Sequence, residues 1–245
     1  MKAIFSAAAL LLAAVLPWEN AQAQTVNRDA TLNIAYGNRP GTLDPYLTTN
    51  NATSDVDRHI FETLFTINAK FEPVPELVES YTLSEDRKTY TFVLRDGIHF
   101  HDGQLLTADD VVASMNRGLA VSTQGKANLP GVQFSKVDAR TVSLTLPAPS
   151  LITLNVLADV KNIAAIMPKR IIDEANSSKK PVTELIGTGP YKLAVFKSGD
   201  YLHLTRYDQY VSRSDPASGP LGQDKADGHD NMSRFITDES DRPSV

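Results

Sequence analysis

Strand-like and helix-like patterns alternate along residues 31–210, and this alternation limits the chain to a mixed α/β fold. In residues 81–100, Tyr90, Phe92 and Leu94 share one face of a predicted strand, and polar residues 85–88 form the turn before it. Strands are also predicted within 31–37 and 137–147, and a hairpin within 187–210. Helical spacing of apolar side chains predicts helices at about 54–67, 108–119, 150–158 and 168–176.

The first 23 residues are typical of a secretory signal peptide and are excluded from the fold. Lys2 precedes an apolar run from Ala3 to Leu16, and the sequence AQAQ allows cleavage after Ala23. The run is shorter than the ~20 apolar residues of a membrane-spanning helix. The signal peptide has no cysteine for a lipid anchor, so the mature chain is predicted to be soluble in the periplasm, starting near Gln24.

Composition excludes two further possibilities. The chain has no cysteine, so its stability has to come from a packed core or a partner rather than from disulfides. Its net charge of −5 provides no basic surface for nucleic acid.

Residues 211–245 are rich in Ser, Asp, Gly and Pro without any period, and they are predicted to be disordered.

The stretch FHDGQLLTADDVV, residues 100–112, allows more than one interpretation together with the preceding His99. A metal site or an acid/base pair is one possibility, because alternate histidines on a strand point the same way and carboxylates follow. The favoured interpretation is structural: Asp-Gly is ordinary turn chemistry, and Thr107 caps a helix whose first turn is acidic. The competing hypothesis is a metal- or carboxylate-dependent hydrolase built on His99, His101, Asp102 and Asp110.

Several sequence blocks occur in an order that resembles one known family. The longest is YTLSEDRKTYTFVLRDGIHFHDGQLLTADDVVASMNRGL, residues 81–119. The others are GTLDPY (41–46), FETLF (61–65), PELVESY (75–81) and GTGPYKLAVFKSGDYLHLTRYDQY (187–210). Together they resemble the family 5 extracellular solute-binding proteins, the dipeptide- and oligopeptide-binding components of ABC importers.

The resemblance implies a class II periplasmic binding protein-like fold, of which this chain holds the first lobe and its accessory domain while the second lobe is missing. On that template residues 24–62 begin lobe I and residues 63–186 form the accessory domain. Residues 187–210 return to lobe I, and residues 211–245 are a tail outside the family pattern.

The same resemblance implies a function. The chain is expected to capture di- or oligopeptides as a monomer and to deliver them to an inner-membrane permease, with no cofactor and no bond made or broken. A nickel complex, an opine or a sugar are alternative ligands. Ligand contacts are expected from the loop after the first strand, where open α/β folds bind. The candidates are Asn38, Arg39, Thr42, Leu43 and Asp44.

The end of the chain departs from the pattern of the family. Family members are longer, and the resemblance is expected to stop soon after Tyr210, near residues 218–222. A truncation, for example by a frameshift, would explain both observations. Such a product is expected to bind peptides negligibly and to be unstable or the remnant of an inactivated gene.

Overall fold

A computed structural model describes residues 31–35, 37–68, 70–158 and 165–213. Contacts divide the chain into two units, Met1–Ile34 and Ala35–Val245. Residues 31–35 form neither helix nor strand and are exposed, so the predicted strand is wrong there. An alternating pattern makes a strand only where a neighbouring strand accepts its backbone hydrogen bonds, and the pattern alone does not supply that neighbour.

The second unit contains a four-stranded antiparallel sheet. Its strands are β3 (Val78–Leu83), β4 (Thr89–Leu94), β6 (Thr141–Thr145) and β5 (Gln133–Lys136), in that order. Tyr90, Phe92 and Leu94 are buried on one face, which confirms the predicted face and the turn before it. The helix α2 (Ala108–Val121) covers that face at β5 and β6.

The core beneath the sheet is rich in aromatic side chains. Phe65, Phe92 and Phe134 are almost fully buried, and the Phe65 and Phe92 rings meet edge to face with centroids 5.5 Å apart. Burying each such side chain contributes about 1.5–3 kcal/mol. This first cluster also takes Val111 and Met115 from α2, so the helix and the sheet stabilise one another.

The helix α1 (Asn51–Ile60) is shifted from its predicted range of 54–67. Asn50 is its N-cap and accepts a hydrogen bond from the Ala52 N–H, so the helix begins before Ser54. After Ile60 the chain becomes extended, and β1 (Phe65–Ile67) pairs with β2 (Pro73–Pro75). The prediction of a helix through Ile67 is therefore wrong, because pairing with a distant segment overrides the helical spacing.

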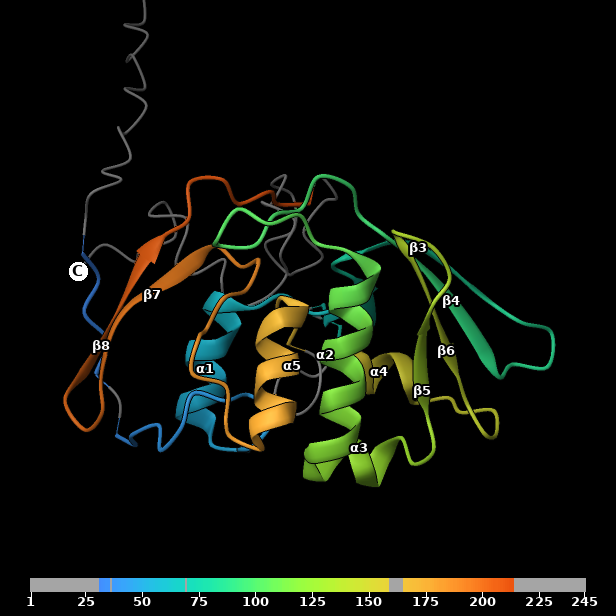
Figure 1. Cartoon of the computed structure of the whole chain (residues 1–245), viewed down its shortest axis with the longest axis horizontal. Helices are drawn as coiled ribbons and strands as arrows, with labels where there is room; N and C mark the ends of the chain where they lie inside the picture. The colour runs from blue at the N-terminus through green and yellow to red at the C-terminus, as the bar shows by residue number, and fades with distance from the viewer. Residues whose placement is uncertain (1–30, 36, 69, 159–164, 214–245) are drawn as a thin grey trace, which may run out of the picture. The chain divides into compact units, whose positions relative to one another are not determined.

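A second cluster of apolar side chains joins α1 to α5 (Lys169–Ser178). Figure 1 shows α1, α5 and α2 side by side, between the four-stranded sheet and the hairpin of β7 (Tyr191–Lys197) and β8 (Tyr201–Arg206). Two short helices, α3 (Thr123–Asn128) and α4 (Thr153–Leu157), follow α2 and β6 in the chain. The predicted helices at 168–176 and, in shortened form, at 150–158 are confirmed.

The hairpin of β7 (Tyr191–Lys197) and β8 (Tyr201–Arg206) is confirmed, with Gly199 at positive φ in its turn. The chain beyond it keeps ordered contacts. Arg95 donates to the carbonyl oxygens of Val211 and Ser212 at 2.8 and 3.0 Å, and Arg213 donates to that of Val78 at 2.8 Å. The predicted disordered tail therefore starts too early at residue 211, and residues 214–245 lie outside the described residues.

Candidate ligand-binding loop

The loop before α1 contains all five predicted ligand contacts, and the structure divides them by exposure. Asn38 and Arg39 are exposed, and Thr42 is half-buried. Leu43 and Asp44 are buried, with no more than a few per cent of their surface accessible. Only the first three side chains therefore reach the surface.

Asp44 holds the loop to two distant parts of the chain. Its Oδ1 accepts the Tyr46 N–H at 2.9 Å, and its Oδ2 accepts the Val182 N–H at 2.8 Å. Arg117 on α2 forms an ion pair with the same Oδ2 at 3.4 Å, and both side chains are buried. The carboxylate is thus committed to fixing the loop against α2 and the segment after α5.

Tyr46 adds a second anchor. Its hydroxyl donates to the Ala165 carbonyl oxygen at 2.6 Å, and the Arg117 guanidinium carbon lies 5.6 Å from its ring centroid. Burial raises the pKa of the Tyr46 hydroxyl, which keeps it protonated and able to donate. Leu43 packs into the second apolar cluster beside it.

A second buried carboxyl, Asp57 on α1, completes the electrostatics beneath the loop. Burial, and after it the negative charge of Asp44, raise the pKa of Asp57 well above the usual carboxyl value. Arg117 balances the charge of Asp44, and the raised pKa of Asp57 disfavours a second negative charge in the same buried place. The loop therefore rests on an electrically balanced base.

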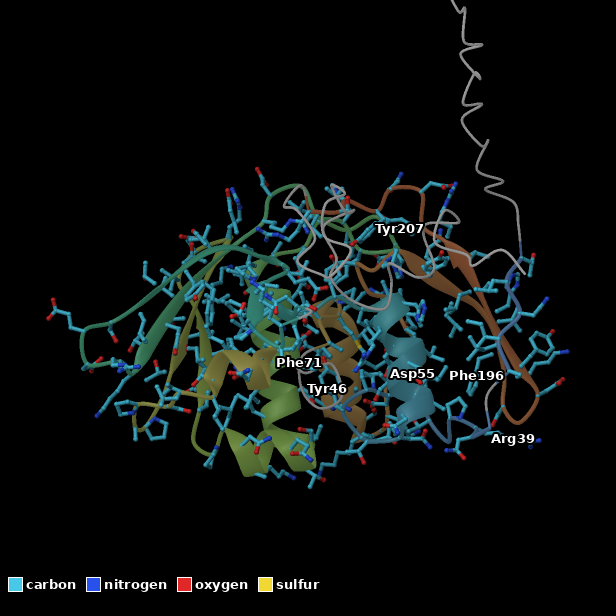
Figure 2. All side chains as sticks on the ribbon, turned by 180° about the vertical axis from the view of Figure 1, so that it is seen from behind. Arg39, Tyr46, Asp55, Phe71, Phe196 and Tyr207 are labelled. Atoms are coloured by element: carbon cyan, nitrogen blue, oxygen red, sulfur yellow. The ribbon has the colours of Figure 1, made fainter. Side chains whose placement is uncertain are left out.

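Arg39 lies at the other end of the loop, beside the turn of the β7–β8 hairpin (Figure 2). A methyl group added at Gly199 would be 3.5 Å from Nη1 of Arg39. The carbonyl oxygen of Arg39 accepts from the Asn50 side chain at 3.5 Å, which ties this part of the loop to the N-cap of α1. The guanidinium of Arg39 forms no ion pair with any residue that the structure describes.

The histidines of the 99–112 stretch do not converge on one site. His99 is exposed, and its Nδ1 is 3.0 Å from the Gly97 carbonyl oxygen. His101 is half-buried, with Nε2 2.8 Å from the Gly189 carbonyl oxygen. Asp102 pairs with Arg170 at 3.1 Å. Within the described ranges, no three side chains of His, Cys, Asp or Glu are grouped so that they could hold a metal ion.

The acidic pair of the same stretch starts α2, as the structural interpretation predicts. Asp110 accepts from the Thr107 backbone N–H at 2.9 Å in a capping box. Its other oxygen accepts the Lys169 N–H at 2.7 Å, and Asp109 pairs with Lys136 at 2.6 Å. The pair thus caps one helix and connects it to the start of α5.

Sequence reasoning missed the structural importance of Gly187 and Gly189. A Cβ at Gly187 would lie 2.8 Å from the Ile60 carbonyl carbon and closer still to its oxygen. A Cβ at Gly189 would lie 2.7 Å from the His59 carbonyl oxygen, and the Gly189 N–H donates to the Ile60 oxygen at 2.9 Å. The G-T-G spacing before Pro190 was the available signal, since glycine is required where backbones approach closely.

A comparison with protein families matches residues 72–234 to the bacterial extracellular solute-binding proteins, family 5 Middle. The chain belongs to this family. The match continues to residue 234, so the prediction that the resemblance stops near residues 218–222 is wrong. Family 5 proteins are binding proteins for transport and not enzymes, so the hydrolase hypothesis is wrong as well.

Curated relatives agree with the family. The chain is 34% identical over 208 residues to a probable peptide ABC transporter periplasmic-binding protein, y4tO, of Sinorhizobium fredii, covering 82% of this chain and 38% of the relative. It is 30% identical over 180 residues to the glutathione-binding protein GsiB of Escherichia coli K12, covering 72% of this chain and 34% of the relative. The chain thus spans between a third and two fifths of the length of these relatives.

Solved structures share the fold. AgaA from A. tumefaciens R10, in complex with agropinic acid, is 30% identical with a TM-score of 0.64, covering 72% of this chain and 36% of AgaA. NikA from Brucella suis, in complex with Fe(III)-EDTA, is 27% identical with a TM-score of 0.65, covering 78% of this chain and 38% of NikA. The fold is therefore that of class II periplasmic binding proteins, matched over part of their length.

Proposed function

We propose that the chain supplies the first lobe and accessory domain of a periplasmic receptor that captures di- or oligopeptides for an ABC importer. The observation that carries the proposal is the family match, together with the relative from Sinorhizobium fredii named for peptides. In this proposal residues 24–62 and 187–210 belong to lobe I, and residues 63–186 form the accessory domain.

The ligand-binding residues follow from the exposure of the loop. Asn38, Arg39 and Thr42 contact the ligand, because they reach the surface. Leu43 and Asp44 act indirectly, by holding the loop on the second apolar cluster and on Arg117. Arg39 receives a carboxylate of the peptide, since an exposed guanidinium binds carboxylates in a two-pronged geometry.

The proposed partner is an inner-membrane permease, and the proposed location of the monomeric receptor is the periplasm. The relative y4tO is named as a periplasmic-binding protein of an ABC transporter. No helix in the described part of the chain is long and apolar enough to cross a membrane. The predicted signal peptide, with cleavage near Ala23, lies outside the described residues.

The ligand class is tested best in a chimera, because the chain spans only 38% of y4tO. Residues 31–213 of this chain would replace the matching segment of y4tO, and calorimetry would measure binding of di- to pentapeptides. Glutathione, an opine, a sugar and a nickel complex form the comparison panel. We expect peptide binding by the chimera, and negligible binding by the separate 245-residue chain, which presents one side of a ligand that hinge closure encloses from two.

Arg39→Ala tests the loop within the same chimera. We expect peptide affinity to fall at least about tenfold, since a hydrogen bond to a charged group contributes ~1.5–3 kcal/mol. Arg87→Ala is the matched control, because Arg87 is exposed in the turn between β3 and β4. A folded chimera that binds another solute of the panel but no peptide would contradict the ligand class. Equal affinities of the two variants would contradict the role of the loop.

A further inference from the structure

His101 lies where three separate segments of the chain meet. Its backbone N–H donates to the Gly187 carbonyl oxygen at 2.9 Å, and its ring meets the Tyr207 ring edge to face with centroids 4.9 Å apart. Tyr207 in turn donates its hydroxyl to the Phe100 carbonyl oxygen at 2.9 Å and its N–H to that of Pro190 at 2.8 Å. The loop before α2 is thereby connected to both ends of the β7–β8 hairpin (Figure 2, Tyr207).

Both ring nitrogens of His101 bond to backbone groups of the Gly187–Gly189 segment. Nδ1 accepts the Gly187 N–H at 3.4 Å, and Nε2 lies 2.8 Å from the Gly189 carbonyl oxygen. An N–H can only donate and a carbonyl oxygen can only accept, so the ring fits when Nδ1 is bare and Nε2 carries the proton. A second proton on Nδ1 would face the Gly187 N–H, donor against donor.

The segment that His101 holds is also the one that seats the hairpin on α1. Gly187 and Gly189 approach the carbonyl groups of His59 and Ile60 so closely that neither has room for a Cβ. A contact this tight depends on the segment being held in place, because a small displacement lengthens the Gly189–Ile60 hydrogen bond.

We propose that His101 is an acid-released latch: its neutral ring holds Gly187–Gly189 against α1, and its protonation frees this segment with the base of the β7–β8 hairpin. The proposal concerns the attachment of the hairpin and is independent of which solute the receptor binds.

The surroundings of the ring favour the neutral form. Burial lowers the pKa of His101 to about 4; the Gly189 carbonyl and Asp102 oppose this shift, and the positive charge of Lys192 on β7 adds to it. The carboxylate of Asp102 is already paired, because it bonds to Arg170 of α5, which also pairs with Glu184.

Two further titratable rings border the junction. The Lys192 ammonium lies 5.4 Å from the Tyr207 ring centroid, and burial raises the pKa of the Tyr207 hydroxyl. On α1, burial lowers the pKa of His59, whose ring packs against Tyr191 with centroids 5.9 Å apart. Neither ring bonds to the backbone of Gly187 or Gly189 in the contacts above, so of the three rings His101 is the one whose protonation changes the hydrogen bonds of the segment.

The sign of the effect follows from the lowered pKa. A histidine with a pKa of about 6.5 when released and about 4 when latched holds the segment fully above pH 6.5, and holds it less as the pH falls towards 4. Between pH 8 and pH 5 the equilibrium for opening is expected to rise about 30-fold.

Hydrogen exchange of the 245-residue chain, corrected for the intrinsic pH dependence of exchange, measures this opening. Between pH 8 and pH 5 we expect the corrected exchange rate to rise about 30-fold in proteolytic fragments that cover Gly187–Gly189. Exchange in the strands β4 and β6 should change little, because it reports opening elsewhere. His101→Gln should reduce the rise to less than about threefold, because glutamine does not titrate. His99→Gln, at the exposed histidine, should retain it.

Several results would overturn the latch. These are a rise below about threefold in the wild-type chain, an equal rise in the sheet, or an unchanged rise in His101→Gln. If His101→Gln does not fold, NMR titration of the wild-type chain decides instead. A His101 midpoint below about pH 5 is expected, and a midpoint of about 6 or above, in the ordinary range of histidine, would refute the proposal.

Discussion

Replacing Gly187 with alanine tests the packing of the hairpin against α1. The added carbon would lie 2.6 Å from Phe61 Cδ1 and 2.8 Å from the carbonyl carbon of Ile60. Ordinary carbon–carbon contacts are about 3.5–4.0 Å, so the segment has to move by about 1 Å. Ile60 is fully buried and the obstacle is its backbone, so no side-chain rotation relieves the clash.

The expected cost of Gly187→Ala is about 3 kcal/mol, at the upper end of the usual range for overpacking. For a chain of this size it corresponds to a fall in melting temperature of roughly 6–12 °C. Urea unfolding followed by far-ultraviolet circular dichroism measures the free energy directly. The change should appear in the midpoint of the transition rather than in its slope.

Gly41→Ala is the matched control. Gly41 has no atom within 4 Å of an added Cβ and no positive φ, so alanine fits without strain. We expect a change of about 0.4–1 kcal/mol towards greater stability, because alanine restricts the unfolded chain. If Gly187→Ala unfolds at the same urea concentration as the wild type, the reasoning about close backbone approach is refuted.

Two further predictions concern the loop anchor and the amino terminus. Asp44→Ala should destabilise the chain by about 3–5 kcal/mol in the same urea assay, because it leaves the buried charge of Arg117 without an anionic partner. A loss below about 1 kcal/mol would contradict the anchoring role. The mature chain is expected to begin near Gln24, and mass spectrometry of a periplasmic fraction checks this; an uncleaved chain in the membrane fraction would contradict it.

Local patterns predicted the buried face of β4 and the start of α2. Tyr90, Phe92 and Leu94 alternate with threonines and valine, and the same alternation decides which face of β4 meets α2. The start of α2 was equally predictable. Thr107 and Asp110 form its capping box within four consecutive residues, without help from the rest of the chain.

The misses have distant causes. The extended chain after α1 is held by Glu76, whose carboxylate accepts the Thr63 N–H at 2.7 Å, and no helical spacing reveals that partner. The burial of Asp44 was not predicted either: Asp44 was placed among the ligand contacts because it lies in the loop after the predicted first strand. Its burial depends on Arg117 and Val182, which the local sequence cannot indicate.

The anchoring of the loop before α1 also bears on the order of folding. The Tyr46–Ala165 and Asp44–Val182 hydrogen bonds join residues 119 and 138 positions apart. Strands β3 to β6 all lie between residues 78 and 145, so the sheet closes shorter loops and loses less chain entropy. During synthesis the loop has to wait for α5 and the segment after it. The loop is therefore made early but anchored only once Val182 has been made.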